Sequence, residues 1–374
     1  MTNILYLRSV FTGEDIYFNR FIERLDTDRF RPIICYLRGP VPKDTELAQK
    51  GYEVFGLPYK RQELRYFNPK IIFELKKILA KKNIGIVHAY RHKPTVYAVL
   101  AAFTNKDIKI ISHVLSTRRS RSISRKLQNL ILMQRVDAII GVSAAVSDDI
   151  KKNNYLIDQK KIRTIYTSVD LERFVSLPDQ KTARSRLGLP QDGWIWGTIG
   201  RLAPVKGHDI LLKAFAAGNL GRKGCHLAIA GDGRLRAWLV QEAEKLGIAD
   251  NVTFLGHIAD IPCFLATLDG FVFPSRQEGL GRALIEALAA GLPCVASRIG
   301  GIEEILQRLC ADGHAFLVPP EDDLALLSAM EDVMNKDQGW RADVASASKD
   351  ATFLFGIDGF LKQMDAMYSD LVSK

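Results

Sequence analysis

Two basic side chains follow an apolar segment in the second half of the chain. Arg201 and Lys206 lie in a loop between Gly200 and Gly207, directly after the run Trp194–Ile199. A guanidinium can donate to two phosphate oxygens at once, and an ammonium group adds a mobile point charge. The spacing therefore predicts a clamp for a diphosphate. The alternative is a solvated basic loop.

Two carboxylates follow a later apolar run that ends at Phe273. We expect a helix from near Leu280, which leaves Glu278 in the preceding loop and places Glu286 about two turns inside the helix. The free amides at the helix start can receive phosphate oxygens. A carboxylate in an otherwise apolar helix is costly without a partner, and the hydroxyls of a sugar or ribose would supply one. A backbone cap or an ion pair with Arg201 is the alternative for Glu286.

Glycines mark two further positions where apolar runs end. Gly231 and Gly233 follow one run directly, and glycine allows a ligand to approach the backbone closely. The G-x-G-x-x-G fingerprint of nicotinamide cofactors is incomplete, because Arg236 stands where its last glycine belongs. The segment Gly300–Glu304 repeats the pattern with two glycines and two acids, which also suit a helix N-terminus.

The elements that position these loops can be predicted from periodicity. Apolar, β-branched runs alternate with amphipathic helical patterns along the whole chain, which is typical of parallel sheets covered by helices. Strands are predicted at Asn3–Leu7, Pro32–Leu37, Ile84–Ala89, Ile108–Val114, Ala138–Val142, Arg163–Tyr166, Trp194–Ile199, His226–Ala230, Val252–Leu255, Gly270–Phe273, Cys294–Ala296 and Ala315–Val318.

We therefore expect an α/β protein of two doubly wound, Rossmann-like domains, with ligands at the carboxyl ends of strands in a central cleft. Proline and glycine punctuate Leu177–Gly193, which predicts the domain boundary. The first domain is expected to span residues 1–178, completed by a C-terminal helix over about 356–374, and the second to span 179–355.

The composition narrows the class of protein. The chain has 374 residues, of which 47% are hydrophobic and 25% charged, as is ordinary for a soluble globular protein of about two domains. No apolar run reaches the roughly 18 residues that a membrane span needs. The five cysteines contain no C-x-x-C pair, so we expect them to be reduced in the cytoplasm and to bind no metal. Asp26–Asp28 imitates a metal-binding D-x-D motif, but we expect only a turn there.

Positive charge is concentrated in the first half. Residues 1–180 contain 32 lysines and arginines against 18 aspartates and glutamates, whereas the remainder contains 20 against 24. This distribution predicts an anionic partner for the first half, and a dense patch lies at Arg118–Lys126. No basic-aromatic motif indicates nucleic acid. An anionic lipid-linked acceptor or an anionic membrane surface is therefore expected, with solubility alone as the alternative.

The order of the motifs carries a family resemblance. G-R-L…K-G, G-D-G, F-x-G, P-S-x-x-E-G-x-G-x-x-x-x-E-A and G-G-x-x-E follow one another between Ile162 and about Val318. This order resembles the retaining nucleotide-sugar glycosyltransferases of family 4. The resemblance implies the GT-B fold and a nucleoside-diphosphate sugar donor, expected to be UDP-linked. It implies neither a cofactor nor a metal, because an Arg/Lys pair takes the place of the cation.

The resemblance also implies roles for individual residues. Glu278 would bind hydroxyls of the donor sugar, Glu286 the ribose, and Gly256-His257-Ile258 the base. His113, near the end of a predicted strand, resembles the family's active-site histidine, which lies near the reacting carbon. The catalytic residues implied are Arg201, Lys206, Glu278 and His113. The donor-binding residues implied are Gly13, Gly200, Gly231, Gly233, Gly256, His257, Ile258, Glu278, Gly279, Leu280, Gly281, Arg282 and Glu286.

The first half resembles the family more weakly. Phe11–Glu14 has one glycine where the family often has a pair, and Thr167-Ser168 replaces the usual Asn-Gly. Weak likeness is expected there, because this domain binds the acceptor and acceptors differ. His88 also lies near the end of a predicted strand, where it either touches the acceptor or is structural.

The hypothesis is a retaining transferase that moves a hexose or N-acetylhexosamine to a hydroxyl of a glycan or lipid-linked acceptor. Cell-envelope polysaccharide or lipopolysaccharide synthesis is the expected setting, in the cytoplasm or on the inner face of its membrane. The leaving phosphate would take the acceptor's proton, so no protein base is assigned. The alternative is a nucleotide-sugar epimerase or hydrolase of the same fold.

Overall fold

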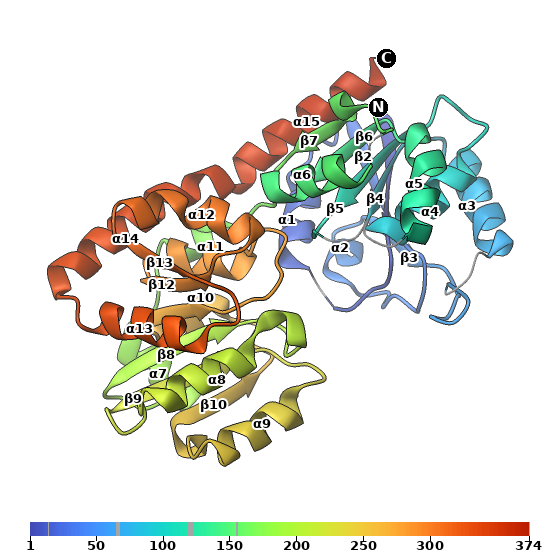
Figure 1. The fold of residues 1–374 in the computed structure, drawn as a ribbon. Coiled ribbons are helices and arrows are strands. Elements are labelled where there is room, and N and C mark those ends of the chain that lie inside the picture. Colours follow the sequence, from blue (N-terminus) through green and yellow to red (C-terminus); the bar gives the residue numbers. More distant parts are fainter. Residues whose placement is uncertain (14, 65–67, 118–122, 155, 374) are drawn as a thin grey trace. The chain divides into compact units, whose positions relative to one another are not determined.

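The chain folds into two units, each built on one parallel sheet (Figure 1). The computed structural model describes residues 1–13, 15–64, 68–117, 123–154 and 156–373. Unit 1 comprises Met1–Ser168 and Ile357–Lys374, and unit 2 comprises Val169–Gly356. The contacts thus divide the chain at Ser168, whereas proline and glycine placed the expected boundary after residue 178.

Unit 1 contains a seven-stranded parallel sheet in the order β3-β2-β1-β4-β5-β6-β7. Its strands are β1 (Thr2–Arg8), β2 (Phe30–Tyr36), β3 (Glu53–Gly56), β4 (Ile84–Tyr90), β5 (Lys109–Val114), β6 (Ala138–Gly141) and β7 (Ile162–Thr164). Its helices are α1 (Ile16–Glu23), α2 (Glu46–Gln49), α3 (Pro69–Lys81), α4 (His92–Ala101), α5 (Ile123–Leu132), α6 (Ala144–Asn153) and α15 (Ile357–Val372).

Unit 2 contains a six-stranded parallel sheet in the order β10-β9-β8-β11-β12-β13. Its strands are β8 (Trp194–Ile199), β9 (Cys225–Ala230), β10 (Val252–Gly256), β11 (Gly270–Phe273), β12 (Cys294–Ser297) and β13 (Ala315–Val318). Its helices are α7 (Gln180–Leu187), α8 (His208–Ala217), α9 (Arg236–Lys245), α10 (Ile261–Ala266), α11 (Arg282–Ala289), α12 (Gly300–Ala311), α13 (Asp323–Met334) and α14 (Gln338–Thr352).

Both sheets reverse their strand order once, and this position matters for binding. In unit 1 the reversal lies between β1 and β4, and in unit 2 it lies between β8 and β11. The connections leave such a pair of strands in opposite directions, so the loops after them part and leave room for a ligand. The expected α/β fold with two doubly wound sheets is confirmed.

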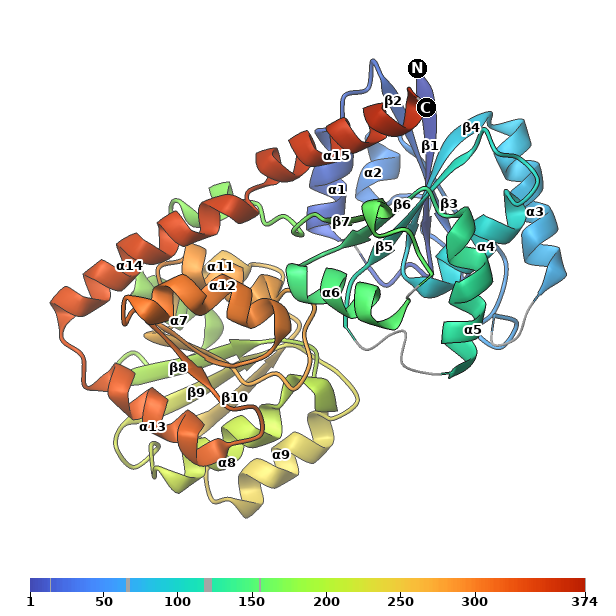
Figure 2. The ribbon, with the colours of Figure 1, turned by 45° about the horizontal axis from the view of Figure 1, so that its top comes forward.

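The last helix of the chain belongs to the core of the first unit. Figures 1 and 2 both draw α15 alongside the sheet of unit 1 and α1. Met364, Met367 and Tyr368 of α15 are fully buried, and Phe360 meets Phe21 of α1 edge-on with ring centroids 5.1 Å apart. The C-terminal helix therefore packs against a sheet that contains β1, the strand at the other end of the sequence.

Smaller expectations can also be compared with the structure. All five cysteines are unpaired, and four of them are buried. At Asp26–Asp28 the chain turns, and the Asp28 amide donates to Asp26 Oδ1 at 3.1 Å. Among the described residues, no helix combines the length and the apolar character that crossing a membrane requires.

Candidate active site

The strand-order reversal of unit 2 brings the two predicted loops together. β8 and β11 are hydrogen-bonded neighbours, so the loop that begins at Gly200 and the loop that begins at Pro274 leave the sheet side by side. The Arg276 amide donates to the Val205 carbonyl at 2.9 Å, which ties one loop to the other. Arg201, Lys206 and Glu278 therefore belong to a single constellation at this edge.

Gly207 makes the close approach of these loops possible. Its φ of +67° lies in the left-handed region, and a Cβ atom there would lie 1.9 Å from the Pro274 carbonyl oxygen. No side chain fits in that space. Gly207 also precedes the first residue of α8, so the start of that helix is fixed against the end of β11.

The loops are held by an ion pair that sequence reasoning missed. Arg276 donates to both carboxylate oxygens of Asp209, at 2.7 Å each, and to the Pro204 carbonyl at 2.7 Å. Burial acts to raise the pKa of Asp209, but the hydrogen bonds and charge of Arg276 outweigh it, and the pKa lies below its ordinary value. The one signal in the sequence that could have indicated this ion pair was the arginine two positions before Glu278. Arg276 is thus a structural clamp.

Lys206 and Glu278 form an ion pair within the constellation. Lys206 Nζ donates to Glu278 Oε2, and each side chain keeps one fifth of its surface exposed. The ammonium also lies 5.0 Å from the centroid of the Phe273 ring. Arg201, by contrast, is exposed and has no hydrogen bond or ion pair within the part of the chain that the structure describes. The site therefore holds one paired cation and one cation that can turn toward an anion.

The second carboxylate is buried in α11. Glu286 is only 5% exposed, whereas Glu278 precedes the helix and accepts a bond from the Gly279 amide at 3.3 Å. The prediction that a helix starts near Leu280 was slightly wrong. The helix begins at Arg282, because Gly281 adopts a φ of +102° that ordinary helical backbone does not allow. Glu286 accordingly lies about one turn inside the helix.

The remaining glycines of the site have contacts inside the protein. A Cβ on Gly231 would lie 2.0 Å from the Gly200 carbonyl oxygen, and one on Gly233 would lie 2.4 Å from that of Leu202. The Gly231 amide donates to the Gly256 carbonyl at 2.7 Å, which brings the end of β10 beside it. These glycines therefore let three loops pack closely. His257 and Ile258 follow directly, and His257 is exposed.

The start of α12 packs on the same region. A Cβ on Gly301 would lie 2.3 Å from the Gly279 carbonyl oxygen, so a glycine is required there. Glu303 forms an ion pair with Arg298 at 3.5 Å. Glu303 therefore has an ion-pair partner on the surface. This agrees with the interpretation that an acid at this position only stabilises the N-terminus of the helix.

Two buried polar atoms next to the site lack a partner. Among the described residues, Nδ1 of His208 and Oγ of Ser275 find no hydrogen bond, although both residues are at least 98% buried. Burial and the charge of Lys206 lower the pKa of His208 to about 4, so the ring is neutral near neutral pH. No role was predicted for either residue from the sequence, although Ser275 is the serine of the P-S-x-x-E motif.

In unit 1, His113 is the residue before the last of β5 and lies in a stack of rings. Its ring centroid lies 4.6 Å from that of Tyr90 and 5.2 Å from that of His88. His88 is fully buried and both of its nitrogens are hydrogen-bonded, to Tyr368 and to His113.

Gly13 has a φ of +105°, and Glu14 lies outside the described residues. The described residues contain no group of three or more His, Cys, Asp or Glu side chains that could hold a metal ion.

Comparisons with known proteins agree with this geometry. Residues 179–350 match the family model described as glycosyl transferases group 1, and residues 12–173 match the one described as glycosyltransferase family 4. The chain belongs to glycosyltransferase family 4. It is a glycosyltransferase of the hexosyltransferase class with the GT-B fold, as the sequence predicted.

Three relatives illustrate the likeness. N-acetyl-alpha-D-glucosaminyl L-malate synthase of Bacillus anthracis is 24% identical over 87% of this chain and 91% of its own. The lipopolysaccharide core biosynthesis mannosyltransferase LpsB of Rhizobium meliloti is 26% identical over 89% and 92%. The solved structure of Anabaena Alr3699/HepE, in complex with UDP and glucose, covers 99% of this chain and all of that one with a TM-score of 0.83 at 21% identity.

The contact at Gly207 yields a stability prediction. Gly207→Ala should lower the free energy of unfolding by several kcal/mol, because the methyl group meets the Pro274 carbonyl as well as a left-handed backbone. Gly188→Ala is the matched control, since Gly188 has a φ of +64° but nothing within 4 Å of its Cβ position. It should cost only about 1–2 kcal/mol. Urea unfolding measures both, and equal losses would contradict the steric argument.

Proposed function

We propose that the protein is a retaining transferase that takes a hexose or N-acetylhexosamine from a nucleoside-diphosphate sugar. The observation that carries the proposal is the constellation after β8 and β11, where exposed Arg201 and the Lys206–Glu278 pair lie at the strand-order reversal. Anabaena Alr3699/HepE, which shares the fold, has been solved with UDP and with UDP-glucose, and this supports a UDP-linked donor.

The proposed chemistry follows from the charges. Breaking the bond between the sugar and the phosphate develops negative charge on the diphosphate, and Arg201 and Lys206 would stabilise it. Lys206 already donates to the carboxylate of Glu278. When the donor binds, phosphate oxygens would replace Glu278 as the partner of Lys206, and sugar hydroxyls would replace Lys206 as the partner of Glu278. Glu278 would then bind the sugar hydroxyls, and the buried Glu286 the ribose. His113 would lie near the reacting carbon, with the leaving phosphate as the base.

The acceptor is proposed to be anionic and linked to a glycan or lipid. LpsB is named for lipopolysaccharide core synthesis, and the excess positive charge of residues 1–180 suits a phosphate-bearing acceptor or an anionic membrane surface. The alternative of an epimerase or hydrolase is separated by one experiment. A panel of nucleotide sugars is incubated with and without glycan acceptors, and turnover that needs an acceptor supports transfer.

The cation pair gives the first test of the donor site. Arg201→Ala and Lys206→Ala should each lower turnover by about 10²-fold, because each removes a donor that stabilises the leaving diphosphate. Arg222→Ala, an exposed arginine of the same unit, is the control and should not change turnover. Turnover by the unaltered enzyme should also persist in EDTA, since these two cations take the place of a metal. Near-normal rates in either variant would contradict the clamp.

Glu286 gives a test of the ribose contact. Glu286→Gln should raise the donor KM more than the acceptor KM, since a carboxylate binds a ribose diol more strongly than an amide does. Glu331→Gln removes a charge from the surface of α13 and is the control. Steady-state kinetics with each substrate varied separately measures both constants. A change confined to the acceptor KM would show that the ribose role is wrong.

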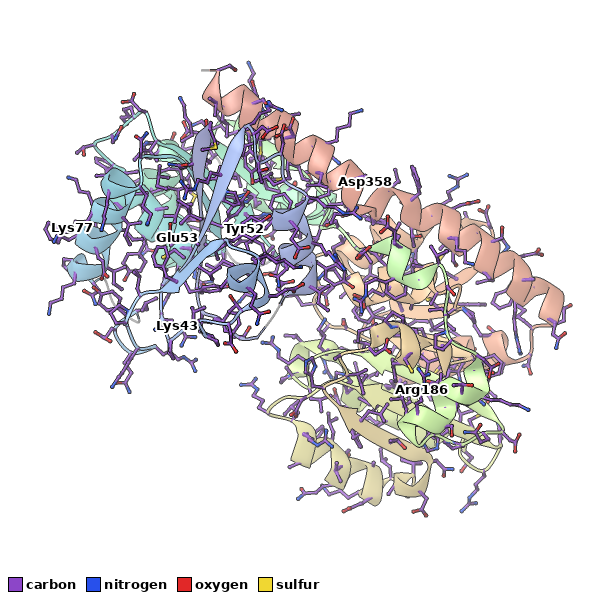
Figure 3. All side chains as sticks on the ribbon, turned by 180° about the vertical axis from the view of Figure 1, so that it is seen from behind. Lys43, Tyr52, Glu53, Lys77, Arg186 and Asp358 are labelled. Atoms are coloured by element: carbon purple, nitrogen blue, oxygen red, sulfur yellow. The ribbon has the colours of Figure 1, made fainter. Side chains whose placement is uncertain are left out.

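The membrane proposal concerns unit 1. Its patch at Arg118–Lys126 lies largely outside the described residues, but α3 also presents positive charge. Phe73 is 62% exposed with the Lys77 ammonium 4.4 Å from its ring, and Figure 3 shows Lys77 at the outer edge of the unit. An exposed aromatic ring among lysines is suited to an anionic lipid surface.

Vesicle co-sedimentation tests this surface. The protein should bind phosphatidylglycerol-containing vesicles and not neutral ones, and salt should reverse the binding by screening. Lys70→Glu with Lys77→Glu should weaken binding about tenfold or more, at about 1 kcal/mol for each basic residue lost. Arg222→Glu with Lys245→Glu makes the same change of charge on unit 2 and should have a smaller effect. Equal binding to neutral vesicles would rule the proposal out.

A further inference from the structure

Four buried side chains of unit 1 form one line of hydrogen bonds. The hydroxyls of Tyr6 and Tyr368 lie 3.1 Å apart, and the Tyr368 hydroxyl lies 2.7 Å from Nδ1 of His88. Nε2 of His88 then lies 3.0 Å from Nδ1 of His113. The line runs from β1 through the C-terminal helix α15 and then β4 to His113, near the carboxyl end of β5. None of the four residues is more than 2% exposed.

The far end of this line lacks a partner. Nε2 of His113 is buried without a hydrogen bond, among the residues that the structure describes. Buried polar groups without a partner are rare in native proteins and call for an explanation. The position of His113, at the edge of the sheet where open α/β sheets bind ligands, supplies one.

Both histidine rings are neutral near neutral pH. Burial, followed by the charge of Arg8, lowers the pKa of His113 to about 3. Burial and the neighbouring His113 ring hold the pKa of His88 well below its ordinary value. Each ring therefore carries one proton, on one nitrogen or the other, and each tyrosine hydroxyl carries one.

Counting these protons gives the line a direction. Four protons serve three contacts, so one proton must remain at some position. If Tyr6 donates to Tyr368, Tyr368 to His88, and His88 Nε2 to His113, the remaining proton lies on His113 Nε2 and no other atom is unpaired. Every other arrangement leaves a tyrosine hydroxyl proton buried without an acceptor and, in addition, a bare Nε2 on His113. The first arrangement has fewer unpaired buried atoms and is favoured.

We propose that Tyr368 and His88 form a directed relay that holds His113 as the tautomer with its proton on Nε2, ready to donate to an oxygen of the bound sugar nucleotide. Tyr368 is thereby a positioning residue for the reaction, although it lies on the last helix of the chain. The inference rests on the proposed sugar transfer for its ligand, and on the geometry of unit 1 alone for the tautomer.

Two matched variants test the direction. Tyr368→Phe removes the donor to His88 Nδ1, so both tautomers of the histidine pair become possible and the Nε2–H form of His113 should decline. Tyr6→Phe removes a hydroxyl that only donates to Tyr368, so the tautomer of His113 should persist. Each variant deletes one hydroxyl from the same buried contact, so a purely structural role would make them alike. The ¹⁵N signals of histidine-labelled protein report the tautomer, with His113 identified by loss of its signal in His113→Asn.

Kinetics give the second measurement. Tyr368→Phe should lower kcat about ten- to a hundredfold with a smaller change in donor KM, the range seen when the group that orients a metal-bound histidine is removed. Tyr6→Phe should retain the kcat of the unaltered enzyme. An Nδ1–H tautomer of His113 in the unaltered protein, an unchanged kcat in Tyr368→Phe, or equal effects of the two variants would each overturn the proposal. Absence of nucleotide-sugar turnover by the unaltered protein would instead refute the proposed function, because the tautomer is measured without any donor.

Discussion

The candidate donor site depends on the contact between two loops that leave neighbouring strands in unit 2. The strand-order reversal places β8 beside β11, and Gly207 lets the two loops meet at a distance that no side chain allows. Arg276 then joins them through Asp209. This fixed frame determines where Lys206 and Glu278 lie, because each is within two residues of one of its anchors. Charged groups held in this way need little rearrangement to meet a ligand.

The frame also explains why opposite charges can share the site. Lys206 and Glu278 neutralise each other, so neither is left as an isolated charge in a partly buried position. Bonds to a phosphate and to sugar hydroxyls would leave both charges with partners, so the proposed exchange would not create an isolated buried charge. The bidentate pair Arg276–Asp209 joins the same two loops, and it would hold their backbone in place during such an exchange.

The sequence predicted the elements whose signals are local. Apolar runs located the strands that lead to the site, including Gly270–Phe273 as observed, and Glu278 lies in a loop as expected. The short strand Glu53–Gly56 was missed, because it carries few apolar residues at the edge of its sheet. Gly231 was interpreted as room for a ligand, whereas the structure shows room for the Gly200 carbonyl as well. The pairing of Tyr368 with His88 joins residues far apart in sequence, and no local pattern encodes it.

The two sheets share a topology, but different side chains lie at their strand-order reversals. In unit 2 the pairs across β8 and β11 join glycine to an aromatic residue, Trp196 with Gly270 and Gly197 with Phe271, and the loops beyond them expose charge. In unit 1 one of the pairs across β1 and β4 joins two rings, Tyr6 and His88. The two units therefore carry different side chains at the same topological position.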